Sequence, residues 1–382
     1  MSTRGDVAPF HVMRVIDAVV ARRAAGLPVI DLSAGQPSTP APAAVRAAAA
    51  QALDGQLLGY TNALGIPPLR AAIARHYRCA YGVDVAPASV AVTTGSSGGF
   101  LYAFLAAFEA GDTVVLARPG YPAYRNMLAA LDCRVVELPC GPQARFQPTV
   151  AQLDGFVADN GAPPDGLVVA SPANPTGTMI AADELAALSR WCDAHGTRLI
   201  SDEIYHGVTY AEPGGTAWSS GRSSVVVNSF SKYFCMTGWR IGWLLAPDDL
   251  LDSVDRLAGN FSICPPALSQ FGAVAAFDAI AELDANVERY RANRDMLLAE
   301  LPRIGVTKIA PPDGAFYIYA DVSRWTDDSL SWSARLLAET GVAVVPGLDF
   351  DTVDGGNYIR MCFAGDGDEL KHAVEILGDW LT

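Results

Sequence analysis

The chain has 382 residues and a mass of 40.3 kDa, a length that predicts two domains or one large domain with an appendage. Hydrophobic residues make up 51% and charged residues 18%, which excludes an intrinsically disordered chain and indicates a sizeable core. The net charge of −14 argues against nucleic acid and anionic membranes as partners, because both would be repelled.

The first predicted elements are a short amphipathic segment over 11–25 and a linker, Ser33–Pro42, that is rich in Gly, Pro and Ser. Seven apolar runs then recur between residues 89 and 247, and continuous apolarity is typical of strands covered on both faces of a mostly parallel sheet. The runs are Ser89–Thr94, Thr113–Ala117, Arg134–Leu138, Leu167–Ala170, Arg198–Ser201, Ser224–Asn228 and Ile241–Leu245.

Helical stretches separate some of these runs. In Asp183–His195, two acidic residues at the start favour the positive end of a helix, and Gly196 is suited to end it. Strand–helix alternation of this kind predicts a large α/β domain of three αβα layers with a mostly parallel seven-stranded sheet.

The C-terminal part reads differently. A long helix over 285–301 leaves the large domain, and further strands are predicted over 315–320, 342–345 and 357–362. We expect a second, smaller α/β domain formed by both termini. The predicted divisions are 1–40 for an N-terminal arm and part of the small domain, 41–284 for the large domain and 285–382 for the small C-terminal domain.

Seven cysteines are scattered without a CxxC pair, and the five histidines show no HExxH spacing. These patterns argue against a disulfide framework and a metal site, and they favour a reducing compartment. The N-terminus lacks the apolar core of a secretory signal, and the longest apolar run, Phe100–Phe108, is far shorter than the roughly 20 residues of a membrane span. We expect a cytoplasmic protein that binds neither membranes nor nucleic acid.

Lys232 is one of only three lysines in the chain. It lies in VVVNSFSKYFCMTGWRIG (225–242), where a predicted strand ends among small hydroxyl and aromatic residues. Poor hydration there would lower the pKa of an amine, as a Schiff-base lysine requires. The alternative is a solvated loop lysine, a description that fits Lys308 and Lys371 better.

Two neighbours of Lys232 suit a phosphate group. Ser229 precedes it by three residues and Arg240 follows it by eight, so both side chains would reach one anion beside the amine. Upstream, SVAVTTGSSGGF (89–100) predicts a strand, a glycine-rich turn and a helix, which directs backbone N–H groups at an anion. A structural turn or a dinucleotide loop would look similar, but the GxGxxG spacing and an acidic ribose-binding residue are absent.

Two more strand ends carry polar residues. SPANPTG (171–177) fixes Asn174 between two prolines, and SDEIYH (201–206) ends a buried strand with Asp202, followed by Tyr205. A carboxylate at such a place is costly unless a cation pairs with it. Each residue alone is typical of a solvated loop or a turn. Together they indicate a site, because ligands of open α/β sheets bind beyond strand ends.

In this combination the chain resembles the class I and II aminotransferases, pyridoxal-phosphate enzymes of fold type I that include aspartate aminotransferase. The resemblance extends from Gly35-Gln36-Pro37 to Arg360 and rests on SPANPTG, SDEIYH and SFSK-x7-R in this order. It implies the fold type I architecture, pyridoxal 5′-phosphate as cofactor and a homodimer with shared active sites. It also implies transfer of an amino group from an amino acid to a 2-oxo acid with ping-pong kinetics.

The resemblance implies a role for each matching residue. Lys232 would bind the cofactor covalently and then carry a proton between substrate and cofactor. Asp202 would pair with the pyridine nitrogen, while Asn174 and Tyr205 would hydrogen-bond the ring O3′.

The same resemblance implies the substrate and phosphate contacts. Arg360 would bind the α-carboxylate of the substrate, assisted by Gly35 and Asn174. The other implied cofactor contacts are the phosphate at Ser96, Ser97, Ser229 and Arg240, ring stacking by Tyr121, and the phosphate in a partner subunit reached by Tyr60.

The donor is expected to be a neutral aliphatic amino acid. Some family members that use dicarboxylates carry a lysine where the glycine turn has Ser97, and others use an arginine of the partner subunit. The side-chain pocket is expected to be bounded by Phe10, His11, Met13, Tyr124 and Phe261. We therefore expect alanine or valine as donor, with pyruvate or 2-oxoglutarate as acceptor.

Other activities remain as alternatives. Aspartate aminotransferase or a C–S lyase of the same fold would use much the same cofactor site, as would a decarboxylase or an acyltransferase. A ligand-sensing regulator would need a DNA-binding extension. An oxidoreductase with a nicotinamide cofactor would leave SPANPTG and SFSK without a role.

Overall fold

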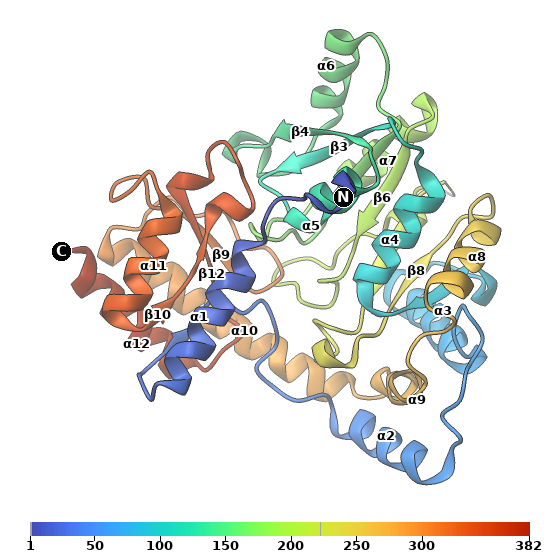
Figure 1. The fold of residues 1–382 in the computed structure, drawn as a ribbon, viewed down its shortest axis with the longest axis horizontal. Coiled ribbons are helices and arrows are strands. Elements are labelled where there is room, and N and C mark those ends of the chain that lie inside the picture. Colours follow the sequence, from blue (N-terminus) through green and yellow to red (C-terminus); the bar gives the residue numbers. More distant parts are fainter. Residues whose placement is uncertain (1, 222) are drawn as a thin grey trace.

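A seven-stranded sheet with helices on both faces forms the centre of the computed structural model, which describes residues 2–221 and 223–382 (Figure 1). The strands are β1 Ile30–Asp31, β2 Val90–Thr93, β3 Thr113–Arg118, β4 Arg134–Pro139, β5 Gly166–Ala170, β6 Arg198–Asp202, β7 Val225–Ser229, β8 Gly242–Leu245, β9 Tyr317–Asp321, β10 Val342–Ala343, β11 Val345–Pro346 and β12 Tyr358–Cys362. The α-helices are α1 His11–Ala24, α2 Ala43–Gly55, α3 Pro67–Tyr81, α4 Gly95–Ala107, α5 Pro122–Ala130, α6 Val150–Asn160, α7 Ala182–His195, α8 Leu251–Phe261, α9 Ala267–Ala276, α10 Ile280–Glu300, α11 Ser329–Thr340 and α12 Gly367–Leu381.

The large sheet has the strand order β2-β8-β7-β6-β5-β3-β4. Neighbouring strands are parallel except at β8, which runs antiparallel to both β2 and β7. All seven apolar runs between residues 89 and 247 are strands of this sheet, so the predicted α/β fold with a mostly parallel seven-stranded sheet is confirmed. The apolarity is continuous because both faces are covered by helices.

Alternate strand residues face two different cores. Ile200 and Val227 point toward one face and pack with Phe100 of α4. Leu199 and Val226 point toward the other face, where α3 and α7 lie. This alternation follows from the two-residue period of a strand, and it sends neighbouring residues at a strand end into different surroundings.

Local sequence signals account for the helix boundaries. Helix α7 begins at Ala182, carries Asp183 and Glu184 in its first turn and stops at Gly196, whose φ of 70° is left-handed. Gly95 has a φ of 67° at the point where β2 turns into α4. The turn at Gly95 places the N-terminus of α4 at the edge of the sheet where β2 ends.

Two smaller sheets hold the C-terminal part together. The antiparallel order β11-β12-β9 forms one, and the parallel pair β1-β10 joins residues near both termini. Figure 1 shows α1 beside these elements, and α1 contacts β11. The strand expected over 342–345 is two short strands, and β1 lies inside a region for which no strand was predicted. The divisions at residues 40 and 284 stay predictions.

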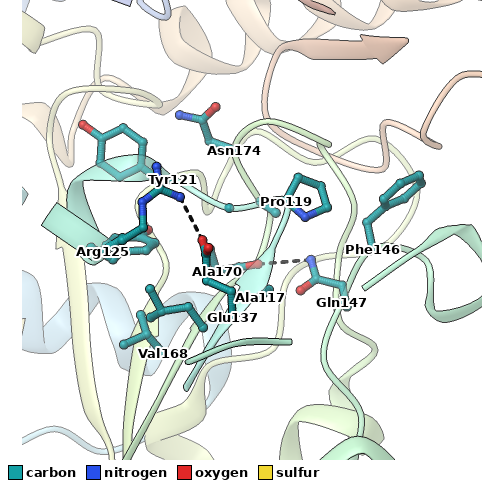
Figure 2. Close-up of a pocket in the computed structure, with 14 residues that line it drawn as sticks. Ala117, Pro119, Tyr121, Arg125, Glu137, Phe146, Gln147, Val168, Ala170 and Asn174 are labelled. Carbon is teal, nitrogen blue, oxygen red and sulfur yellow. Dashed lines mark hydrogen bonds and ion pairs between the residues drawn. The ribbon is translucent and has the colours of Figure 1, made fainter. Parts of the chain in front are cut away.

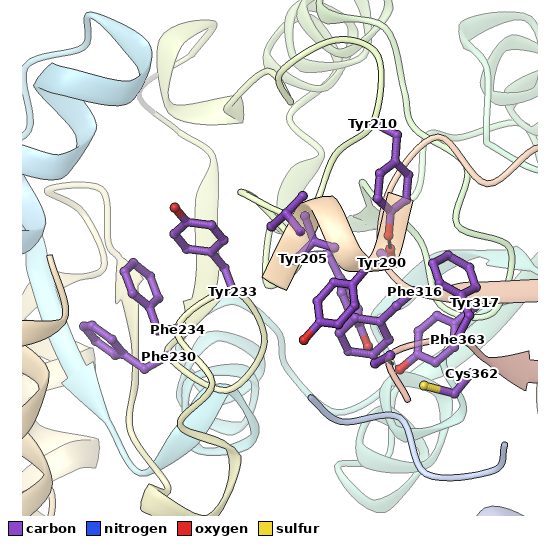
Figure 3. Close-up of a cluster of buried hydrophobic side chains, with 14 of the residues drawn as sticks. Tyr205, Tyr210, Phe230, Tyr233, Phe234, Tyr290, Phe316, Tyr317, Cys362 and Phe363 are labelled. Atoms are coloured by element: carbon purple, nitrogen blue, oxygen red, sulfur yellow. Dashed lines mark hydrogen bonds between the residues drawn. The ribbon is translucent and has the colours of Figure 1, made fainter. Parts of the chain in front are cut away.

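Aromatic side chains fill the space between the large sheet and the C-terminal part (Figure 3). The Tyr205 ring centroid lies 5.4 Å from that of Phe316 and 5.6 Å from that of Tyr317, and Tyr290 of α10 lies 5.6 Å from Phe316. Tyr205 is therefore held where the two parts of the molecule meet. Within residues 2–221 and 223–382, no helix has the length and apolar character needed to cross a membrane.

Candidate active site

A cleft of about 210 Å³ lies where the parallel strands end, and the C-terminal part closes one side of it. Ten of the twelve predicted site residues line it, namely Gly35, Ser96, Ser97, Tyr121, Asn174, Asp202, Tyr205, Lys232, Arg240 and Arg360. Ser229 and Tyr60 do not line it. Residues that are far apart in the chain converge here because the turns after β2, β3, β5, β6 and β7 share one edge of the sheet.

The Lys232 amine points into this cleft from the turn after β7. Its Nζ donates a hydrogen bond to the Gly35 carbonyl oxygen at 2.6 Å and lies 5.6 Å from the Tyr205 ring centroid and 5.9 Å from that of Phe316. Burial lowers the pKa of Lys232 to about 8. A share of the amine is therefore neutral near pH 7 and is able to accept a proton or attack an aldehyde.

Asp202 ends β6 and is buried in the cleft floor. Its Oδ1 accepts a hydrogen bond from the Ile204 backbone N–H at 3.0 Å, and its Oδ2 accepts one from the Tyr124 hydroxyl. Burial raises the pKa of Asp202 to about 6, while these hydrogen bonds and the Lys232 charge oppose the rise. The carboxyl group is thus mainly ionised at neutral pH and able to hold a cationic N–H group.

Arg360 on β12 is a buried cation without a carboxylate partner. Its Nη1 donates to Asn174 Oδ1 at 2.8 Å and its Nη2 to the Ser33 carbonyl oxygen at 2.9 Å, while its Nε has no partner among the described residues. The side chain is only 3% exposed, and no carboxylate of the described chain lies within 4 Å of it. A buried, uncompensated guanidinium is costly, so this end of the cleft suits a carboxylate ligand.

Tyr317 was not predicted as a site residue, yet it lines the cleft between Tyr205 and Arg360. Its hydroxyl lies 2.6 Å from the Tyr205 hydroxyl, and its ring centroid lies 4.4 Å from the guanidinium carbon of Arg360. A Cβ on Gly35 would lie 2.3 Å from the Tyr317 hydroxyl oxygen. Glycine at position 35 therefore permits the close approach of this backbone to both Tyr317 and Lys232.

The opposite end of the cleft suits an anion. Helix α4 starts there with Gly95, Ser96 and Ser97, and within the described chain no side chain caps its N-terminus, so its first N–H groups are free to bind a ligand. Arg240 lies beside this terminus, since a Cβ on Gly95 would come within 2.5 Å of Arg240 Nη2. Two N–H groups, a helix dipole and a guanidinium together suit a phosphate group.

Ser229 is placed differently from the prediction. It is buried behind the cleft wall, where its hydroxyl lies 2.8 Å from that of Ser231 and accepts the Ser231 backbone N–H at 3.0 Å. Ser231 and Thr237 line the cleft instead. The spacing from Lys232 does not reveal which of the two hydroxyl groups lines the cleft.

Tyr121 lines the cleft at the start of α5, and a second, much smaller cavity of about 20 Å³ lies behind it (Figure 2). That cavity has room for about one water molecule. Figure 2 shows its ion pair, in which Arg125 Nη1 lies 2.8 Å from Glu137 Oε1. The pair ties α5 to β4 and so supports the loop that carries Tyr121.

The side-chain pocket matches the expectation in part, since Phe10 and Tyr124 line the cleft as expected. Phe10, Val12, Phe100 and Met127 give the cleft an apolar wall. Met13 and Phe261, which were expected there, are exposed and do not line it, and neither does His11. Tyr124 lies in the floor, where it donates to Asp202, and no signal in the sequence announced that contact.

Tyr60 lies outside the cleft of its own chain and is 84% exposed. It borders a surface hollow together with Cys264 and Pro265. Leu57, Phe261 and Ile263 are also large apolar residues exposed to solvent. The structure therefore does not bring Tyr60 to the site of the same chain.

Comparison with known proteins identifies the family. The family model described as aminotransferase class I and II matches residues 28–377. A valine–pyruvate aminotransferase of Mycobacterium tuberculosis is 56% identical over 100% of this chain and 98% of its own length. The chain belongs to the class I and II aminotransferases.

Solved structures of other aminotransferases share the fold. The crystal structure of an aminotransferase from Mycobacterium tuberculosis has a TM-score of 0.96 at 56% identity, covering 100% of this chain and 98% of that one. Aspartate aminotransferase from Thermus thermophilus, solved with maleate, has a TM-score of 0.93 at 31% identity, covering 99% of each chain. This protein is accordingly an aminotransferase with the aspartate aminotransferase-like fold, and it transfers an amino group from an amino acid to a 2-oxo acid.

The residues of the cleft fit the cofactor of the aminotransferase family. The uncapped α4 terminus beside Arg240 suits a phosphoester, the buried Asp202 carboxylate suits a protonated ring nitrogen, and the Lys232 amine with its lowered pKa suits an aldehyde. Among the described residues, no group of three or more His, Cys, Asp or Glu is arranged to hold a metal ion.

Proposed function

We propose that this aminotransferase uses pyridoxal 5′-phosphate to move the amino group of alanine or valine to pyruvate or 2-oxoglutarate by ping-pong kinetics. The observation that carries the proposal is that one cleft contains both the uncompensated Arg360 cation and an apolar wall. The wall, formed by Phe10, Val12 and Met127, suits an aliphatic side chain, while Arg360 suits the α-carboxylate. The 56% identical relative, named for valine and pyruvate, supports the same donor class.

The absence of a further cation argues against a dicarboxylate donor. Within the described chain, the cationic side chains that line the cleft are Lys232, Arg240 and Arg360, and each has a proposed task. A second carboxylate on the donor would be desolvated against Phe10 and Val12 without a cationic partner from the described residues of the same chain, which is costly.

We propose that the cofactor is held along its whole length. Asp202 would hold the pyridine nitrogen, Asn174 and Tyr205 the ring O3′, and Tyr121 the ring face. The phosphate would be bound by Ser96, Ser97, Ser231 and Arg240, and Ser229 would support the Ser231 hydroxyl from behind the cleft wall. When bound, pyridoxal phosphate supplies an electron sink that stabilises a carbanion at the substrate Cα.

The residues of this chain supply the remaining chemistry. Arg360 would fork the substrate carboxylate, assisted by Gly35 and Asn174, and so aim the Cα–H bond at Lys232. The Lys232 amine, with its pKa lowered to about 8, would take the Cα proton and return it at the cofactor carbon. Tyr205, Phe316 and Tyr317 would keep water from this proton transfer.

We also propose a cytoplasmic homodimer in which Tyr60 of each subunit reaches the phosphate of its partner. The exposed Tyr60, Leu57 and Phe261 support this assembly, because apolar side chains gathered on one surface are typical of interfaces. All seven cysteines are free, which favours a reducing compartment. Chromatographic sizing is expected to give twice the chain mass.

A panel of amino donors tests the proposal. Steady-state rates with alanine, valine, glutamate and aspartate, each with pyruvate or 2-oxoglutarate, are expected to favour alanine and valine over aspartate. Aspartate turning over orders of magnitude faster than valine would contradict the donor class. Ammonia, thiol or CO2 release without an oxo-acid acceptor would indicate a lyase or a decarboxylase instead.

Replacement of the lysine tests the chemistry. Lys232→Ala is expected to abolish turnover and the visible absorbance of the lysine-bound cofactor, whereas Lys308→Ala, at an exposed lysine paired with Asp321, is expected to change neither. Retention of that absorbance in Lys232→Ala would refute the assignment of the lysine.

A further inference from the structure

Helix α1 begins without a cap from its own segment. Phe10 occupies the N-cap position and its side chain makes no capping hydrogen bond. The first backbone N–H groups of the helix instead reach across the fold to one carboxylate. His11 N–H donates to Asp349 Oδ1 at 2.8 Å, and Val12 N–H donates to Asp349 Oδ2 at 2.6 Å.

This carboxylate comes from 337 residues or more away in the sequence. It caps the helix in a bidentate manner, with both oxygens used, and the negative charge lies at the positive end of the helix dipole. Asp349 is buried, so water does not compete for these two N–H groups.

The segment that carries Asp349 is itself fixed to the cofactor side of the cleft. The Asp349 carbonyl oxygen accepts a hydrogen bond from Arg125 Nη2 at 3.3 Å, and the Phe350 carbonyl oxygen accepts one from the Gly120 backbone N–H at 2.9 Å. Arg125 is the α5 residue whose ion pair with Glu137 appears in Figure 2. The loop before α5 and the start of α1 are therefore both hydrogen-bonded to the same short segment, Asp349–Phe350.

The start of α1 carries the part of the cleft that would meet the substrate side chain. Phe10 and Val12 both line the cleft, and the Phe10 ring stands edge-on to Tyr121 with centroids 6.0 Å apart. A helix whose first N–H groups lost their acceptor would fray from this end, and Phe10 and Val12 would move with it.

We propose that Asp349 is a positioning residue that sets donor specificity, because it holds the N-terminus of α1 and thereby places Phe10 and Val12 against the substrate side chain. The proposal rests on the proposed function in that the donor carries an aliphatic side chain. Asp349 itself touches neither substrate nor cofactor. Its effect is on which side chain is accepted rather than on the proton transfer.

The test compares Asp349→Ala with a matched control in the holoenzyme. Asp366 caps α12 from the N-cap position, where its Oδ1 accepts both the Asp368 N–H at 2.9 Å and the Glu369 N–H at 3.2 Å, and it does not line the cleft. We expect Asp349→Ala to lower the ratio of kcat/KM for valine over alanine by about tenfold, the scale of a lost methyl contact. Asp366→Ala is expected to leave this ratio unchanged.

Two further variants guard against a general loss of structure. Asp349→Asn keeps one acceptor oxygen, so it is expected to lower the ratio of kcat/KM for valine over alanine less than Asp349→Ala does. Phe10→Ala is expected to lower the ratio, and the Phe10→Ala, Asp349→Ala double variant is expected to lower it by less than the product of the two single losses, because part of the effect of Asp349 passes through Phe10. Amide hydrogen exchange over residues 11–14 should quicken in Asp349→Ala and stay as in wild type in Asp366→Ala.

The outcomes separate this inference from the proposed function. A wild-type ratio in Asp349→Ala, or equal losses in Asp349→Ala and Asp366→Ala, would overturn the specificity role while leaving the aminotransferase assignment intact. A wild-type enzyme that turned over aspartate but neither alanine nor valine would instead overturn the proposed donor class, and the specificity role with it.

Discussion

Asp202 and Glu203 are neighbours at the end of β6. Both are buried, but their side chains face opposite sides of the sheet. Asp202 faces the cleft, where Tyr124 and Lys232 lie, and its pKa is raised to about 6 by burial. Glu203 faces the other side of the sheet, where its Oε1 accepts the Ala217 N–H at 2.8 Å. Burial raises the pKa of Glu203 to about 8.

The difference shows that burial alone does not make a carboxyl group a partner for a cationic ligand group. His206 Nδ1 lies 3.5 Å from Glu203 Oε2, and burial lowers the pKa of His206 to about 3. Since that imidazole is neutral, it supplies no charge to compensate Glu203. At neutral pH Asp202 is therefore mainly ionised and available as a partner for a cation, whereas Glu203 is mainly protonated and serves packing.

The largest expected effect comes from removing the negative charge of Asp202 and comparing the result with the same change at Glu203. Asp202→Asn keeps the shape of the side chain but removes the charge that would hold the pyridine nitrogen. We expect kcat/KM to fall about 1000-fold, the scale of about 4 kcal/mol for a broken buried pair. Glu203→Gln, one residue away, is expected to change kcat/KM less than threefold. Steady-state rates with the preferred donor measure both, and similar losses in the two variants would refute the distinction.

Much of this site was predictable because it lies in short motifs that follow apolar strands. Asn174, Asp202 and Lys232 each lie at or just beyond a strand end, and the ends of parallel strands meet at one edge. The same alternation that separates Ile200 from Leu199 makes neighbouring acids face opposite sides. The side of the sheet with the cleft, however, is decided by helix packing that no single motif encodes.

Other parts of the site were beyond reach of the sequence. Tyr317 was not predicted, because it lies far along the chain from the motifs of the site, and only the folded C-terminal part brings it to the cleft. Ser231 rather than Ser229 lines the cleft because of the local direction of the turn after β7. The prediction that Met13 lines the pocket is wrong, because Met13 lies on the face of α1 that is exposed to solvent.

The second effect concerns the stability of the cofactor-free protein. The pKa of Glu203 is about 8 in the folded state, above its ordinary value of 4.5. The contribution of Glu203 to the free energy of unfolding is therefore complete below pH 4.5, where the side chain is protonated in both states. That contribution is lost as the pH rises through 8. Between pH 5 and pH 8 wild type should lose about 3 kcal/mol relative to Glu203→Gln.

Denaturant titrations at pH 5, 7 and 8 measure this free energy of unfolding. Asp202→Asn serves as the comparison, because the raised pKa of Asp202 places its own change lower, between its ordinary 3.8 and about 6. Differences between Glu203→Gln and wild type that do not vary with pH would contradict the buried, protonated state of Glu203.

A third effect concerns the rate at which cofactor-free enzyme captures pyridoxal phosphate. Only the neutral Lys232 amine attacks, so the rate is expected to fall about tenfold for each pH unit below the pKa near 8 and to level off above it. The Asp202 charge raises this pKa, so Asp202→Asn should shift the midpoint to lower pH and Glu203→Gln should leave it in place. Stopped-flow absorbance follows the reaction, and a midpoint near 10 in wild type would refute a desolvated lysine.

The smallest expected effect compares one tyrosine on each side of the sheet. Tyr124 donates to Asp202 on the cleft side, and Tyr81 lies 2.8 Å from His206 Nδ1 on the core side. Tyr124→Phe removes a hydrogen bond that lowers the pKa of Asp202, so kcat/KM should fall about fivefold at pH 7, the scale of one hydrogen bond, and further at pH 6. Tyr81→Phe should cost about 1 kcal/mol of stability and leave kcat/KM at both pH values unchanged. If Tyr81→Phe lowered kcat/KM with the same pH dependence as Tyr124→Phe, the two sides of β6 would be coupled, and the sheet would not separate the charged acid from the neutral one.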